Sequence, residues 1–84
     1  MPADPDSRAR EGVYALPPAG MSKREIEAAR LVALGCSDAD IAAHLGISES
    51  TAHKHVESGR RRLSAKNRAH MAALSLSLGI ATPA

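Results

Sequence analysis

The feature that most restricts the fold of this chain is a connection of only three residues, Gly-Ile-Ser at positions 46–48, between two stretches with a helical pattern. Ile41 and Leu45 lie at helical spacing before the connection, and Gly46 can end their helix because glycine readily adopts left-handed backbone angles. Ser48 can then cap the next helix. Two helices joined by about three residues that include glycine cross at a steep angle, which is the geometry of a helix-turn-helix.

The chain from Ser22 onward reads as helices throughout, each opened by a capping residue. Ser22 and Glu25 form a capping box, and Ser37 and Asn67 stand before two further apolar periodic stretches. The predicted helices cover residues 22 to about 34, 37 to 45, 49 to about 63 or 64, and 67 to about 79. The prediction is an all-α fold of four helices with one domain at residues 21–79. A flexible arm at residues 1–20, which holds four of the five prolines, precedes the domain, and a tail at residues 80–84 follows it.

The third predicted helix, at residues 48–63, has distinct faces when successive residues are placed about 100° apart. Its packed face consists of Ala52, Val56, Gly59 and Leu63. Its outward face consists of Ser50, Lys54, Glu57 and Arg61, flanked by His53, Ser58 and Arg60. Lysine can donate to N7 or O6 of guanine, and a carboxylate can accept from N4 of cytosine. An ordinary solvated helix has a similar composition, but the turn that precedes this helix favours a role in reading DNA.

Residues 21–74 resemble the DNA-binding domains of the LuxR/GerE family. The matching elements are Arg24-Glu25, Gly35-x-Ser37, Ile41-Ala42, Leu45-Gly46-Ile47-Ser48, Thr51, His55, Leu63 and Asn67-Arg68. The resemblance implies that the third helix enters the major groove and that the fourth helix forms a dimer interface. The positions that it implies face bases are His53, Lys54 and Glu57, and those that it implies face phosphates are Ser50, Thr51, Ser58 and Arg61. Because 84 residues leave no room for a receiver or ligand-binding domain, the chain is similar to the free-standing GerE type.

A stripe of Met71, Leu74 and Leu78 on the fourth predicted helix indicates a homodimer interface. The only aromatic residue of the chain is Tyr14, and a domain of this size buries only about 60% of its unfolded surface. The core is therefore thin, and a partner that covers apolar surface would stabilise it.

Three residues depart from the pattern of the family. Gly59 replaces a large apolar residue, which predicts a gap on the packed face and costs up to about 1 kcal/mol in helix propensity relative to alanine. Ala52 stands where valine is usual and thins the same region. Glu57 would repel phosphate unless it meets a cytosine amino group. These departures predict weaker DNA affinity than is usual for the family.

Other classes of function find little support. The single cysteine, Cys36, cannot form an internal disulfide, and His53 and His55 point away from each other rather than toward a shared metal. No nucleophile has an identifiable base, so we expect no enzymatic activity, no metal and no cofactor. With neither a signal peptide nor a long apolar run, the chain is expected to be cytoplasmic and associated with the bacterial nucleoid.

Two alternatives stay open beside a DNA-binding regulator. The net charge is only +2, although residues 59–84 carry five basic and no acidic side chains. A chain of this kind could be an adaptor or anti-activator that binds RNA polymerase or another regulator, and Gly59, Glu57 and the acidic second helix permit that role. It could also correspond to the fourth region of a sigma factor, to which Gly-Arg-Arg-Arg-Leu at residues 59–63 is similar.

Overall fold

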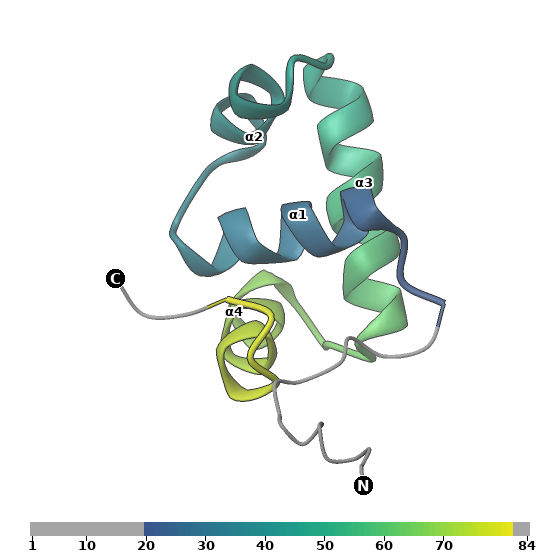
Figure 1. Ribbon diagram of the computed structural model, residues 1–84, viewed down its shortest axis with the longest axis vertical. Coiled ribbons are helices and arrows are strands. Elements are labelled where there is room, and N and C mark those ends of the chain that lie inside the picture. The colour runs from purple at the N-terminus through teal and green to yellow at the C-terminus, as the bar shows by residue number, and fades with distance from the viewer. Residues whose placement is uncertain (1–19, 82–84) are drawn as a thin grey trace, which may run out of the picture.

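A computed structural model describes residues 20–81 of the chain, which form four helices joined by short turns (Figure 1). The helices are α1 (Lys23–Ala33), α2 (Asp38–Leu45), α3 (Glu49–Arg62) and α4 (Arg68–Ser77). No strand occurs within residues 20–81, so the predicted all-α fold of four helices is confirmed there. The predicted N-terminal arm lies outside the described residues apart from Gly20, and so do residues 82–84 of the predicted tail.

All four helices begin at the predicted capping residues. The side-chain oxygens of Ser22, Ser37 and Ser48 each accept a hydrogen bond of 3.1 Å from the backbone N–H three residues later. The oxygen of Asn67 accepts the equivalent bond, at 2.8 Å. Ser22 and Ser37 also take part in complete capping boxes. These bonds satisfy amides that have no partner inside the helix, and they explain why the helix starts could be read from local sequence.

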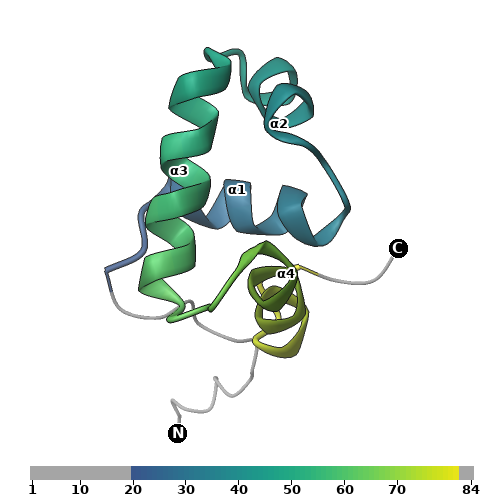
Figure 2. The ribbon, with the colours of Figure 1, turned by 180° about the vertical axis from the view of Figure 1, so that it is seen from behind.

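Helix α1 lies at the centre of the domain, between α3 and α4 (Figures 1 and 2). Helix α2 packs against α3, whose N-terminal end stands beside it. The two are joined through Gly46, whose φ of +70° ends α2 with a left-handed turn. This arrangement is the predicted helix-turn-helix, and it leaves one long side of α3 uncovered by the other helices.

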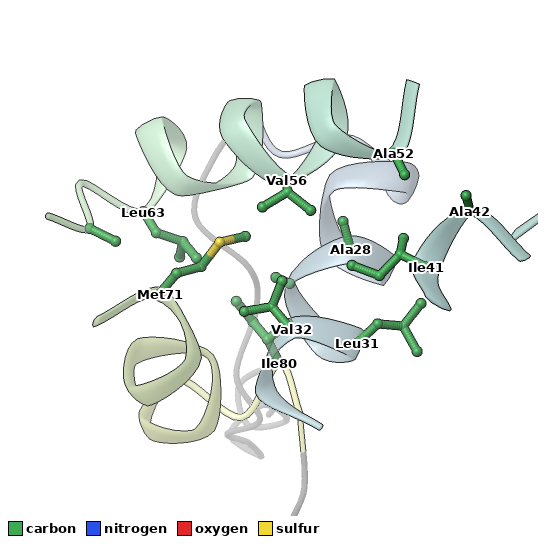
Figure 3. Close-up of a cluster of buried hydrophobic side chains, with 12 residues drawn as sticks. Ala28, Leu31, Val32, Ile41, Ala42, Ala52, Val56, Leu63, Met71 and Ile80 are labelled. Atoms are coloured by element: carbon green, nitrogen blue, oxygen red, sulfur yellow. The ribbon is translucent and has the colours of Figure 1, made fainter. Parts of the chain in front are cut away.

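The hydrophobic core lies where α3 and α4 meet α1, and it continues into the contact of α2 with α3 (Figure 3). The predicted packed face of α3 is confirmed, since Ala52, Val56, Gly59 and Leu63 are all buried. Aliphatic and methionine side chains form most of this core, as expected of a sequence with a single aromatic residue. Its largest fully buried hydrophobic side chains are Ile41, Met71 and Val56.

The expected gap at Gly59 is absent. A Cβ added to Gly59 would lie 3.0 Å from Cε of Met71 and 3.4 Å from the carbonyl oxygen of Glu25. Figure 3 shows the Met71 side chain extending from α4 toward α3. The lost side-chain volume at Gly59 is therefore replaced by a methionine from α4 and by the close approach of the α1 backbone, neither of which is visible in the sequence of α3 alone.

The domain also extends beyond its predicted end at residue 79. Ile80 and Ala81 are only 7% and 3% exposed, although the predicted tail began at residue 80. The Ile80 amide donates to the carbonyl oxygen of Ser75 at 2.8 Å, and Nε of Arg30 donates to the carbonyl oxygen of Ile80 at 3.4 Å. A turn after α4 thus folds Ile80 back onto α1, which a helical pattern that stops at Gly79 does not indicate.

Candidate nucleic-acid interface

Three hydroxyl groups gather where α3 begins. Oγ of Ser48 caps the helix and also donates to Oγ1 of Thr51 at 2.8 Å, while Oγ of Ser50 lies 3.4 Å from Oγ of Ser48. Ser48 and Ser50 are exposed and Thr51 is half-buried. The predicted phosphate contacts Ser50 and Thr51 therefore lie together, next to backbone amides whose partial positive charge favours an anion.

Lys54 stands one turn further along, near the centre of the outward face of α3. Its side chain is exposed, and no carboxylate among residues 20–81 forms an ion pair with it. Val56, on the opposite side of the helix, is 1% exposed. The packing of α3 thus directs the lysine away from the protein, where its ammonium group can reach an anionic or hydrogen-bonding partner.

Glu57 shares this face, but an arginine on its own helix engages it. Nε and a terminal nitrogen of Arg60 both donate to Oε1 of Glu57 at 3.1 Å, and a second terminal nitrogen donates to the carbonyl oxygen of Ala65 at 2.9 Å. These hydrogen bonds hold the pKa of Glu57 below its ordinary value, against the smaller opposing effect of desolvation. The carboxylate stays ionised, is oriented by Arg60, and keeps Oε2 available as an acceptor.

Ser58 and Arg61, two predicted phosphate contacts, line one open hollow with Glu25 and Arg62. The hollow has a volume of about 330 Å³. Nε of Arg62 lies 3.6 Å from Oε1 of Glu25, which is nearly buried. Arg61 is exposed and makes no ion pair with another residue of the described range, so its guanidinium is the cation of this hollow that remains available.

His53, the remaining predicted base contact, is tied to α2 and α4 through one carboxylate. Its Nδ1 lies 2.9 Å from Oδ2 of Asp38, and a terminal nitrogen of Arg68 donates to Oδ1 of Asp38 at 2.8 Å. A second nitrogen of Arg68 donates to the carbonyl oxygen of Cys36, also at 2.8 Å. Sequence reasoning missed Asp38 and Arg68, because each is 15 positions from His53 and only the tertiary fold brings them together.

The predicted site residues of α3 therefore lie along one side of the helix. From Ser50 to Arg61 they span about 16 Å of the helix axis, at about 1.5 Å per residue. The major groove of B-DNA is about 12 Å wide and admits an α-helix.

No cluster of three or more potential metal ligands is found within residues 20–81, and no helix of that range is long and apolar enough to cross a membrane.

The residues predicted to form a dimer interface do not share one environment. Met71 has no exposed surface, so its assignment to an interface is wrong, because it fills the core opposite Gly59. Leu74 and Leu78 are half-buried against the core. Leu76, which the predicted stripe omitted, is the large hydrophobic residue of α4 that stays exposed, at 43%.

Comparison with protein families settles the class of this helix-turn-helix. Residues 19–75, more than half of the chain, match the GerE model, described as bacterial regulatory proteins, luxR family. The chain belongs to the LuxR family. A comparison with individual curated proteins finds no match. In a LuxR-family domain, the unit formed by α2, the turn and α3 is the DNA-binding helix-turn-helix of a transcription regulator. The family is one of DNA-binding domains and not of enzymes.

Proposed function

We propose that this LuxR-family chain is a sequence-specific transcription regulator that binds double-stranded DNA as a homodimer, with α3 in the major groove. The observation that carries the proposal is the outward face of α3. Lys54 and Arg61 lie exposed there, and the intervening carboxylate of Glu57 is neutralised by Arg60. Such a regulator would act in the cytoplasm, on the nucleoid.

Within this proposal, His53, Lys54 and Glu57 contact base edges. An exposed lysine can donate to guanine, and the ionised carboxylate of Glu57 can accept from N4 of cytosine. Because Arg60 already offsets the charge of Glu57, repulsion of the DNA backbone by this carboxylate is smaller than the sequence suggests. Phosphates are contacted by the flanking groups, Ser50, Thr51, Ser58 and Arg61, which fix the position of the helix without reading sequence.

The homodimer would use the exposed side of α4. Leu76 is exposed on this helix, and an open, mostly apolar hollow of about 400 Å³ lies between α4 and the end of α1. Its lining residues are Val32, Gly35, Cys36, Arg68, Ala69 and Ala72. Leu34, at the end of α1, is 56% exposed. A second copy that covers these apolar groups would add the stability that a thin core lacks.

Two alanine variants test DNA reading by failing in different ways. Lys54→Ala should cost about 1–3 kcal/mol on the preferred duplex and relax selectivity at one base position. Arg61→Ala should weaken binding to all duplexes alike and reduce the slope of log K against log salt by about 1. Arg30→Ala is the matched control, since it removes one positive charge from α1 on a side chain that bonds Ile80 rather than facing outward from α3.

Binding to RNA polymerase or to another regulator is the competing function. If the chain has this competing function, Lys54→Ala and Arg61→Ala should keep parental affinity for genomic duplexes in a purified binding assay. The same two variants should lose the capture of a protein partner. That result would show that the outward face of α3 serves a protein, and the assignment as a DNA reader would be wrong.

A further inference from the structure

The link between Asp38 and His53 joins the helix that would read DNA to the rest of the domain. Asp38 is the first residue of α2, its side chain is 22% exposed, and it receives hydrogen bonds from both Arg68 and His53. The His53 side chain is 59% exposed. One edge of the imidazole is therefore held by the protein while much of the ring faces solvent.

The ionisation of Asp38 decides which nitrogen of His53 carries the proton. Desolvation raises the pKa of Asp38, but hydrogen bonds from Arg68 and His53 outweigh this effect and keep the pKa below its ordinary value. An ionised carboxylate can only accept hydrogen bonds, so Nδ1 of His53 has to be the donor. A neutral imidazole has one N–H, and the lone pair is then left on Nε2, the nitrogen that points away from Asp38.

We propose that Asp38, held in place by Arg68, is a positioning residue that sets the tautomer of His53, so that Nε2 accepts a hydrogen bond from a base that carries an amino group. In the major groove these groups are N6 of adenine and N4 of cytosine. The inference rests on the proposed function, since it assigns a base preference to one position of the DNA site. It assigns to Asp38 and Arg68 an effect on specificity without any contact with DNA.

The tautomer can be measured in the free protein. Long-range ¹H–¹⁵N spectra of the imidazole ring should show Nδ1–H for His53 in the parent at pH 8, and a mixture of the two tautomers in Asp38→Ala. Asp40→Ala is the matched control, because it removes a carboxylate from the same turn that bonds Ser37 and not His53. It should keep the parental tautomer. An Nε2–H tautomer in the parent would overturn the assignment whether or not the protein binds DNA.

The base preference can be measured in two steps. Selection from randomised duplexes with the parent and with His53→Ala identifies the base position at which the variant loses selectivity. Affinities are then measured for duplexes that differ only at that position. The parent and Asp40→Ala should prefer adenine or cytosine there by roughly 2- to 12-fold, the range of one hydrogen bond. Asp38→Ala should lose most of this preference, and should add nothing when it is combined with His53→Ala.

The two levels of the argument fail differently. If the parent enriches no sequence at all, the proposed function is wrong and the base preference falls with it. If the parent enriches a sequence but Asp38→Ala keeps the full preference at the His53 position, DNA reading stands and the role of Asp38 is refuted.

Discussion

Gly59 offers a direct test of how tightly α1, α3 and α4 pack, because Gly59→Ala has two opposing effects. Alanine gains up to about 1 kcal/mol over glycine in helix propensity. The new methyl group would, however, lie 3.0 Å from Cε of Met71, where carbon atoms prefer about 3.5–4.0 Å. Either Met71 retreats by about 0.5 Å or more, or α3 moves away from α1.

Neither movement is easy in this core. Met71 is 0% exposed, so its terminal methyl cannot turn into solvent, and the Glu25 carbonyl oxygen at 3.4 Å belongs to the backbone of α1. Overpacking of a filled core costs about 1–3 kcal/mol. After the gain in helix propensity is subtracted, we expect Gly59→Ala to lower the free energy of unfolding by about 1 kcal/mol.

Urea denaturation followed by far-UV circular dichroism measures this change, with an unchanged m value showing that the variant still unfolds as one unit. Met71→Leu supplies the control, because it removes Cε at a cost below about 1.5 kcal/mol. In the Met71→Leu background Gly59→Ala should become stabilising. The packing argument is refuted if Gly59→Ala stabilises the parent, or if it costs the same in both backgrounds.

Three further predictions concern the turn after α3, the dimer and acid stability. Ser64 has a φ of +56°, so Ser64→Gly should stabilise the domain by roughly 1 kcal/mol in the same urea assay, whereas a loss would show that the serine side chain compensates its backbone cost. Leu76→Asp should yield a folded monomer in sedimentation at micromolar concentrations at which the parent is a dimer, because Leu76 is 43% exposed; an unchanged dimer would move the interface away from α4. Asp38, Asp40 and Glu57 have lowered pKa values, so the stability that they contribute is complete above their ordinary values of 3.8, 3.8 and 4.5 and is lost as pH falls below them. Asp40→Ala should therefore show a shallower loss of stability between about pH 4.5 and 2 than the parent, and an equal loss would show that Asp40 contributes none of the dependence.

The parts of this fold that could be predicted are those decided within a few residues. Ser22, Ser37, Ser48 and Asn67 bond to amides three positions away, so each helix start is written in a short stretch of sequence. The packed face of α3 followed from helical spacing for the same reason. These predictions needed no knowledge of how the helices are arranged.

The errors arose where one helix fills the space left by another. The stripe on α4 identified Met71 as apolar but could not distinguish a partner protein from the space opposite Gly59. Ile80 follows the last helix, and it is held against the core by hydrogen bonds to Ser75 and Arg30. The same limit hid the bonds of Asp38 to His53 and Arg68, because a helical wheel shows which side chains face outward but not which distant side chain meets them.

The run Arg60, Arg61 and Arg62 shows how this limit affects the candidate interface. In the sequence these are three equivalent cations, but successive residues of a helix point about 100° apart. Arg60 is bound by Glu57 and by a backbone carbonyl, Arg62 faces Glu25, and Arg61 alone of the three has no carboxylate partner among the described residues. The outward face of α3 thus offers fewer available cations than its composition suggests. Phosphate contacts contribute much of the affinity of DNA-binding proteins. A second copy doubles the number of these contacts, and the gain in DNA affinity matters most where a single copy makes few of them. The scarcity of available charge on α3 and the exposed Leu76 on α4 are therefore the two observations that support our proposal of a dimer on DNA.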